Sequence, residues 1–449
     1  MKPSRRKEDT VSGKYIVRQP IKDADSSVIG YELLYYGENQ AFGEDSVSPG
    51  GAEGAAPNPP ASGNDFAAAN AIYNFLTQNT DKALTGTLNF MTFTPTLLMK
   101  KAPRLFKKSE LVIQIEDSVI IHPLAMHFVQ QFAKEGYKIA VNEFRFAPRY
   151  LALMDKIHYI KLNFASTPAT TLANVIELAH SMGKKCIATN INDPVLYNAA
   201  VGLKVDALEG PFVAEKLSCK AHTSGYLQGN FFRLMVAVTR DEPDIDEIER
   251  MVSQDASLVF GLLRMANSVY FSSSHRATTI RQAIMTLGLG QIRQWIYLLS
   301  ASNAENKIDP SSEEFLKLSF LRANFCSDLI DYTPRDVLSI TKADAYLIGM
   351  FSTLGYLVDA PMEEILAEVP VVEEVKRALL YREGPAGKLY SLLLSYERAN
   401  WDQINVLANE LNIPTNLLTS VYFDSVDRAN IIWARITAPE ADDLPEESV

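Results

Sequence analysis

Polar side chains that could take part in chemistry recur at the ends of short apolar runs in the first half of the chain. Carboxylates, amides, a lysine and a threonine are among them. If each run is a parallel strand, these side chains gather at the carboxyl ends, where the chemistry of such folds takes place. Ordinary polarity of strand ends is the alternative that the pattern leaves open. The residues are Glu32, Asn89, Gln114, Glu116, Asn142, Glu143, Lys161, Asn163, Thr189 and Glu209.

Eight apolar runs are predicted to be the strands that position these residues. Helix candidates, such as 123–135 and 168–182, separate many of them, and each run is nearly continuously apolar. That combination is typical of a parallel sheet covered by helices, and eight strands favour a closed α/β barrel. The predicted strands are 15–21, 28–36, 88–93, 111–116, 138–144, 159–164, 185–191 and 207–212.

The second half of the chain has helical periodicity instead. In residues 251–299, Asp255 is a plausible N-cap, and Leu258, Leu262 and Met265 then recur at helical spacing. Gly288 breaks the following helix. We therefore predict an all-helical domain. The expected organisation is a tail at 1–13, a barrel at 14–217 with a flexible insertion at 38–65, a linker at 218–226, a helical domain at 227–436 and an acidic tail at 437–449.

Composition limits the function classes. A net charge of −11 over 449 residues argues against non-specific nucleic-acid binding and against an anionic membrane surface. No apolar run reaches the length of a membrane span. The three cysteines stand far apart and the histidines are isolated, so we expect no disulfide and no metal site. A cytoplasmic protein is predicted.

Two blocks in the helical half resemble the HDOD family. The string D-x-x-L-x-x-x-L-L-R-x-x-N-S begins at Asp255, and A-I-x-x-L-G follows at 283–288. The resemblance implies a helical, signalling-associated relative of the HD-type metal phosphohydrolases. It assigns a structural role to Asp255, Leu263, Arg264, Asn267, Ser268 and Gly288.

The segment RQPIKDADSSVIGYELL resembles the opening of EAL domains, which are barrel phosphodiesterases that linearise cyclic di-GMP with divalent metal ions. Glu32 stands where the name-giving glutamate stands. The resemblance assigns Asn89 as a metal-ligand asparagine and Lys161 as the lysine of the K-I-D motif. It implies a pocket containing Gln19, Glu32, Leu34, Asn89 and Lys161.

Departures from the EAL pattern predict a pocket without metal. Gln114, Asn142, Asn163 and Thr189 replace carboxylates, and Glu209 stands for a glutamine. About four ligand charges are thereby lost, and a metal-activated water has no anchor. Tyr36 stands where an arginine would hold phosphate, which argues against tight nucleotide binding.

The helical half departs from catalytic HD enzymes in the same way. Ser352 and Thr353 occupy the places of the metal-binding His-Asp pair, and neutral hydroxyls are poor ligands there. A helix-turn-helix at 283–299 is rejected because Trp295 and Ile296 make its second helix a core helix.

The sequence therefore predicts a bacterial-type EAL–HDOD signalling protein that is not an enzyme and needs no cofactor. It would act by recognising a regulatory protein or a second copy of itself, without nucleic acid or membrane. Two alternatives remain. One is a non-hydrolytic cyclic di-GMP sensor, and the other is a residual phosphodiesterase that uses Glu32, Asn89, Glu116, Glu143 and Lys161.

Overall fold

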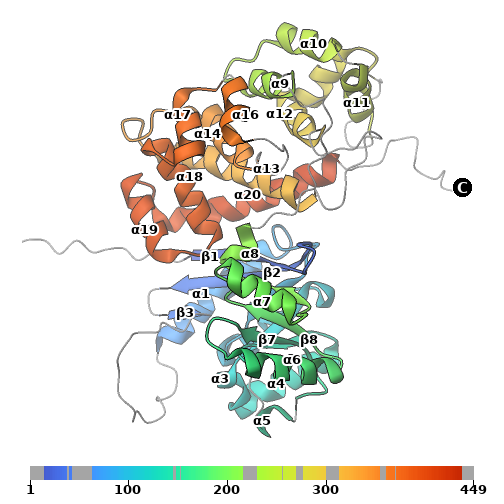
Figure 1. Cartoon of the computed structure of the whole chain (residues 1–449), viewed down its shortest axis with the longest axis vertical. Helices are drawn as coiled ribbons and strands as arrows, with labels where there is room; N and C mark the ends of the chain where they lie inside the picture. The colour runs from blue at the N-terminus through green and yellow to red at the C-terminus, as the bar shows by residue number, and fades with distance from the viewer. Residues whose placement is uncertain are drawn as a thin grey trace, which may run out of the picture. The chain divides into compact units, whose positions relative to one another are not determined.

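The chain separates into two compact units (Figure 1). The first contains Met1–Lys216, Ser395–Val406 and Pro414–Thr419, and the second contains Leu217–Leu394, Leu407–Ile413 and Ser420–Val449. The sequence prediction divided the chain once, at the linker 218–226. It therefore did not assign the two late segments to the first unit. The computed structural model describes residues 15–37, 40–42, 63–144, 148–151, 153–215, 230–254, 256–268, 277–299, 313–353, 361–369 and 371–436.

The predicted barrel is confirmed in the first unit. Its strands follow the order β1-β9-β8-β7-β6-β5-β4-β2, and pairing of β1 with β2 closes the ring. A short strand, β3 (Gln40–Phe42), pairs with β2 outside the ring. The barrel strands are β1 (Tyr15–Lys22), β2 (Val28–Gly37), β4 (Asn89–Thr92), β5 (Leu111–Ile115), β6 (Lys138–Val141), β7 (Ile157–Asn163), β8 (Lys185–Thr189) and β9 (Ala207–Leu208).

The sheet is not parallel throughout, which corrects the sequence prediction. β1 is antiparallel to both β2 and β9, whereas the other neighbours in the ring are parallel. The turn from Asp23 to Ser27 explains this direction. Its backbone closes through bonds from Asp23 N to Ser27 O and from Ser26 N to Asp23 O. A connection this short can only join antiparallel strands, because a parallel crossover needs a dozen or more residues.

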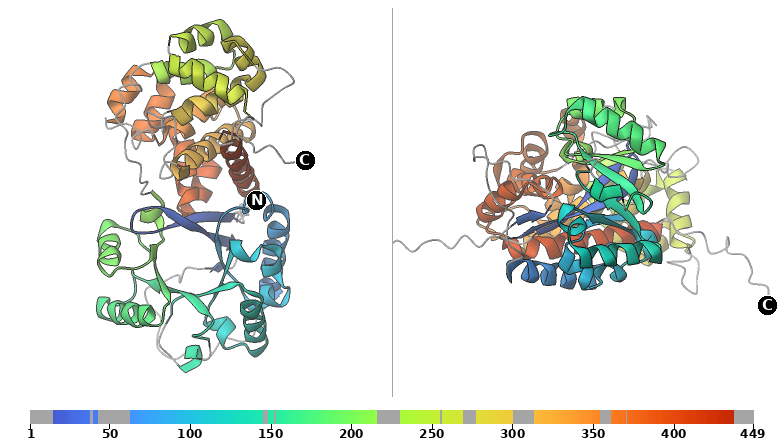
Figure 2. Two further views of the ribbon diagram at one scale, coloured as in Figure 1. Left: turned by 90° about the vertical axis from the view of Figure 1, so that its right-hand side faces the viewer. Right: turned by 90° about the horizontal axis from the view of Figure 1, so that it is seen from below.

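Helices cover the outside of the barrel (Figure 2). Local sequence fixes several of their ends: Asp193 caps α7 by accepting from Val195 N and Leu196 N, and Pro194 opens it. Gly136 closes α4 in the left-handed conformation. The helices are α1 (Gly63–Asn79), α2 (Pro95–Met99), α3 (Asp117–Ile120), α4 (Pro123–Glu135), α5 (Pro148–Leu151), α6 (Ala169–Ser181), α7 (Pro194–Gly202) and α8 (Pro211–Glu215).

Seven buried side chains form one apolar layer of the barrel core: Ile21, Phe90, Val112, Ala140, Tyr159, Ile187 and Ala207. Successive side chains of a strand point to opposite faces, so the next inward position lies two residues further along. In β5 and β7 these positions are Gln114 and Lys161. A polar layer therefore lies directly above the apolar one, toward the carboxyl ends of the parallel strands.

Late segments of the chain belong to the barrel unit through contacts with β1. The Tyr15 hydroxyl donates to Asn405 Oδ1 at 2.7 Å, and its ring stacks on Trp401 with centroids 6.0 Å apart. The Tyr396 hydroxyl donates to the carbonyl oxygen of Ile16 at 2.8 Å. Helical residues from 396 to 405, which the sequence prediction assigned to the helical domain, thus pack on β1.

The second unit is helical, as predicted. In α12 Gly288 has φ +74°, so the helix is kinked at the break that the sequence predicts. The helices after the barrel are α9 (Asn230–Thr239), α10 (Ile245–Ser253), α11 (Ala256–Ala266), α12 (Ile280–Leu299), α13 (Glu313–Leu329), α14 (Lys342–Phe351), α16 (Met362–Glu368), α17 (Glu373–Tyr381), α18 (Gly384–Glu397), α19 (Trp401–Glu410) and α20 (Thr415–Ile436). Parts of α18, α19 and α20 belong to the first unit.

The predicted insertion at 38–65 is too long, because its first part contains β3 and its end contains the start of α1. The predicted tails and the linker at 218–226 lie outside the described residues. Within the described part of the chain, no helix combines the length and apolarity needed to cross a bilayer.

Candidate functional site at the carboxyl ends of the barrel strands

Four buried polar residues from four strand ends meet inside the barrel. Glu32 lies on β2, Gln114 on β5 and Lys161 on β7, and Glu209 directly follows β9. Each is less than a tenth exposed. The backbone of Glu209 is fixed by its N–H, which donates to the carbonyl oxygen of Ala188 at 2.9 Å.

Lys161 is the centre of this polar layer. Its ammonium nitrogen lies 2.7 Å from Glu32 Oε2, 2.6 Å from Glu209 Oε1 and 2.8 Å from Gln114 Oε1. The amide of Gln114 also donates to Glu32 Oε1 at 2.9 Å. One ammonium group therefore contacts both carboxyl groups, and the surrounding bonds hold both in fixed orientations.

The two carboxyl groups have opposite pKa shifts. Burial raises the pKa of Glu32, but the charge of Lys161 and bonds from Glu209, Lys161 and Gln114 outweigh it, so the pKa is lowered. Burial and the nearby charge of Glu32 raise the pKa of Glu209 well above its ordinary value. Glu32 is thus the ionised partner of Lys161, and Glu209 is the group that accepts a proton.

A half-exposed rim lies above the buried layer. The Asn142 amide donates to Thr92 Oγ1 at 3.0 Å, and Gln114 donates to the same oxygen at 3.3 Å. Asn163 lies beside Glu143, with 3.4 Å between Nδ2 and Oε1. Glu143 has φ +48°, a left-handed conformation that costs energy in a residue with a side chain.

The structure brings most of the predicted pocket residues together. Gln19 is opposite Glu32 in the β1–β2 register, and Leu34 lies on the same face of β2. Both therefore share the inner face with Glu32. Lys161, the lysine of the motif, lies at the centre of the polar layer. The side chain of Tyr36 lies outside what the structure describes.

Asn89 does not join this pocket, which corrects its assignment as a ligand. Its amide donates to the carbonyl oxygens of Leu84, Thr87 and Glu110, which precede β4 and β5. It follows that Asn89 lies at the amino-terminal end of β4. Its neighbour Phe90 is in the inner layer, so Asn89 points to the other face.

Thr92 is the β4 residue that sequence reasoning missed. It lies two positions after Phe90 and is the register partner of Gln114. Strand parity, counted from Phe90, was the signal that could have found it. Glu116, included in the residual-phosphodiesterase alternative, instead lies at the N-cap of α3.

The described HDOD signature residues lie on α11, directly after α11, and in α12. Asn267 makes two hydrogen bonds to the backbone of Ala277. Its Nδ2 donates to the Ala277 carbonyl at 3.1 Å, and its Oδ1 accepts from Ala277 N at 2.9 Å. Ser268 is buried, whereas Arg264 is exposed and Leu263 is half-buried on α11. Asp255 lies outside the described residues.

Neutral hydroxyl groups cluster around Thr353, which with Ser352 stands in place of the metal-binding His-Asp pair of HD enzymes. The Tyr297 hydroxyl lies 2.7 Å from Thr353 Oγ1 and 3.0 Å from Ser319 Oγ, and it donates to the Met350 carbonyl at 3.0 Å. Ser319 and Thr353 are 2.6 Å apart. Arg322 donates to Ser352 Oγ at 3.1 Å. These bonds join α12, α13 and the end of α14.

The family model described as the HDOD domain matches residues 226–376. The second unit carries an HDOD domain. A closed eight-stranded barrel precedes it, so the chain has the order of barrel and helical HDOD domain that the sequence predicted.

Two proteins are similar along nearly the whole chain. The uncharacterized protein YuxH of Bacillus subtilis is 28% identical over 404 residues, covering 89% of this chain and 94% of the relative. The cyclic di-GMP phosphodiesterase CdgJ of Vibrio cholerae is 27% identical over 416 residues, covering 91% of each.

Solved EAL structures show more distant similarity. The Bacillus subtilis YkuI protein, in complex with cyclic di-GMP and calcium, is 15% identical with a TM-score of 0.35, covering 55% of this chain and 72% of that one. An EAL domain protein of Listeria monocytogenes is 14% identical with a TM-score of 0.32, covering 45% and 88%.

The expectation that the chain is not an enzyme is contradicted by the similarity to CdgJ, which is named as a phosphodiesterase and covers both domains. That expectation was based only on the carboxylates that are missing from the EAL motif positions. The structure shows two buried carboxyl groups, Glu32 and Glu209, converging on Lys161. Glu209 had been treated only as a replacement for a glutamine.

Proposed function

We propose that this chain acts in cyclic di-GMP signalling as a cyclic di-GMP phosphodiesterase, with its site in the polar layer of the barrel. The observation that carries the proposal is the convergence of Glu32, Glu209 and Lys161 at the carboxyl ends of the strands. Similarity over both domains to a protein named as such a phosphodiesterase supports it.

Oxygens of this layer and of its rim are of the kind that a divalent cation takes. Glu209 Oε2 and Asn142 Oδ1 are buried and have no hydrogen-bond partner among the described residues. Carboxylate and amide oxygens are the ligands that magnesium and calcium take. Glu32, Glu209 and Asn142 would hold the ion, which would supply the Lewis acidity that activates water for phosphodiester hydrolysis.

The remaining residues of the layer orient the ligands. Lys161 lies within 2.8 Å of atoms from Glu32, Glu209 and Gln114, so it limits the repulsion between the two carboxyl groups. Gln114 fixes Glu32 through its amide, and Thr92 accepts from both Gln114 and Asn142. The site is thereby held in one arrangement before substrate arrives.

The test is hydrolysis of cyclic di-GMP by the purified full-length chain in the presence of Mg²⁺ or Mn²⁺, with the linear product measured by chromatography. Glu32→Gln keeps the shape but removes the charge, and we expect turnover to fall by about 100-fold or more. Glu177→Gln, on the exposed face of α6, is the matched control and should keep full activity. Binding of the dinucleotide without turnover would overturn the proposal.

We also propose that the chain recognises a protein partner or a second copy of itself. Affinity capture with the intact chain and with Glu32→Gln would separate this role from catalysis, because recognition alone does not need the charge at Glu32. Sedimentation of the pure chain as a monomer would exclude self-association.

A further inference from the structure

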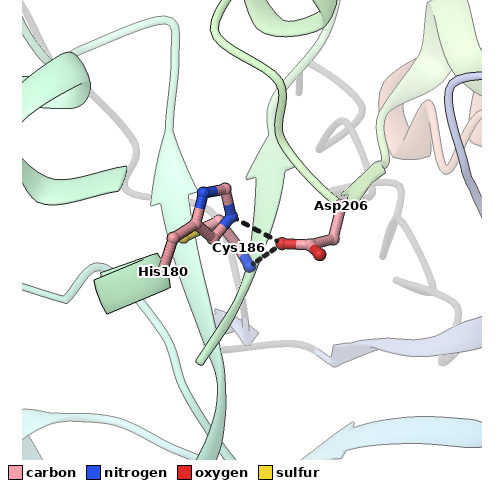
Figure 3. A group of neighbouring side chains, drawn as sticks. All are labelled: His180, Cys186 and Asp206. Carbon is pink, nitrogen blue, oxygen red and sulfur yellow. Dashed lines mark hydrogen bonds and ion pairs between the residues drawn. The ribbon is translucent and has the colours of Figure 1, made fainter. Parts of the chain in front are cut away.

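Three side chains with metal-binding atoms meet on the barrel (Figure 3). They are His180, Cys186 and Asp206, and their ligand atoms all lie within 4.8 Å of one another. An imidazole, a thiol and a carboxylate are the donors that zinc takes in proteins.

Three separate elements position these side chains. His180 lies in the last turn of α6, Cys186 is the second residue of β8, and Asp206 directly precedes β9. The cluster therefore lies at the amino-terminal ends of β8 and β9. Glu209 and Lys161 lie toward the carboxyl ends, so the two groups of residues are distinct.

Hydrogen bonds already hold Asp206 in place. Its Oδ2 accepts from the backbone N–H of Cys186 at 2.7 Å and lies 2.9 Å from His180 Nε2. Both contacts use the same oxygen, which leaves Oδ1 without a hydrogen bond among the described residues. The side chains of His180 and Asp206 are 37% and 35% exposed, so an ion can reach them from solvent.

We propose that His180, Cys186 and Asp206 form a binding site for one zinc ion or a similar borderline-soft divalent cation. Three protein ligands leave a fourth tetrahedral position to water. The ion would connect α6 to the beginnings of β8 and β9. Because this is the face of the barrel opposite the catalytic one, the ion would stabilise the barrel and take no part in hydrolysis.

Binding requires one proton transfer and no change of oxidation state. Burial, with the negative charge of Asp206, raises the pKa of Cys186 to about 12, so the free site holds a thiol. When the ion binds, the S–H bond breaks, a metal–sulfur bond forms, and the proton goes to solvent. The thiol is otherwise unreactive, because the thiolate is the nucleophile.

Sequence spacing gave no sign of this site. The three ligands are separated by five and nineteen intervening residues, outside the short pairs that predict zinc sites. The expectation of no metal site rested on that spacing. Adjacent strands β8 and β9, with the helix that precedes β8, bring the ligands together.

The experiment titrates the purified full-length chain with Co²⁺, whose thiolate complexes absorb by charge transfer, followed by competition with Zn²⁺. We expect one such site per chain. Cys186→Ser should abolish the thiolate band, and His180→Ala should weaken binding by more than the roughly 10-fold that losing an outer-shell partner costs. His180 is exposed, so its variant tests the site without emptying the core.

Two controls complete the test. Cys219→Ser should retain the thiolate band, and His127→Ala, on the exposed face of α4, should retain the affinity. Zn²⁺ should also raise the Tm of the native chain by more than that of His180→Ala. An unchanged Co²⁺ affinity in His180→Ala, or binding without a thiolate band in the native chain, would overturn the proposal.

Discussion

The two units each bury a polar cluster, and the clusters differ in charge and in completeness. In the barrel, Lys161 and Glu32 form a buried ion pair beside Glu209, and the Glu209 Oε2 atom lacks a hydrogen-bond partner in the described structure. In the helical unit, Tyr297, Ser319 and Thr353 are neutral hydroxyl groups that bond to one another. A charged cluster with unused oxygens is suited to bind a ligand, whereas a closed neutral cluster is suited to hold helices together.

Lys161→Met gives the sharpest test of this difference. Removing the ammonium leaves two buried carboxyl groups without their cation, and breaking a buried pair in this way costs about 3–5 kcal/mol. Urea unfolding of the barrel transition would measure the loss. Adding Glu32→Gln should recover part of it, because the buried charge is then removed. Lys185→Met, at an exposed position of β8, should change little.

Gly349→Ala should produce the largest effect in the helical unit. A Cβ at this position would lie 2.2 Å from the carbonyl oxygen of Arg322, where α14 crosses α13. Overpacking against backbone is expected to cost about 2–3 kcal/mol, although alanine favours a helix. Thermal unfolding measures it. Equal stability of variant and native chain would show that the two helices can separate without cost.

Tyr297→Phe should have a smaller effect. It removes the hydroxyl while Ser319 and Thr353 keep their mutual bond and Thr353 keeps its bond to Met350 O, so the expected cost is about 1 kcal/mol. Hydrolysis of cyclic di-GMP should be unchanged, because the cluster has no catalytic role in our proposal. Loss of turnover in a folded variant would contradict the contrast between the two clusters.

Glu209→Gln should have the smallest effect of these substitutions. At acid pH the variant and the native chain should differ little in stability, and the variant should become relatively more stable as the pH rises. The pKa of Glu209 is raised in the folded state, so folding favours the protonated form. The native chain therefore loses stability as pH rises from the unfolded pKa through the folded one. The glutamine variant does not titrate, so its Tm relative to the native chain should increase as the pH rises above the ordinary glutamate pKa of 4.5. A constant difference would exclude the raised pKa.

Much of the barrel was predictable because its signal is local. Runs such as 111–116 and 159–164 are apolar and short, and β5 and β7 occupy them. The direction of β1 was not predicted. The prediction of parallel strands rested on helices between strands, and a short turn rather than a helix joins β1 to β2. The site was predicted in part: Glu32, Gln19 and Lys161 were assigned to it, whereas Thr92 was missed.

The sequence by itself determined the elements, the barrel and the HDOD domain, because apolar periodicity and motif spacing are properties of neighbouring residues. Only the tertiary structure decided which polar side chains meet. A strand alternates faces at every residue, so the choice between Asn89 and Thr92 depended on the register with β5. The pairing of Glu209 with Lys161, and of Asp206 with His180, likewise needed strands and helices distant in sequence to lie side by side.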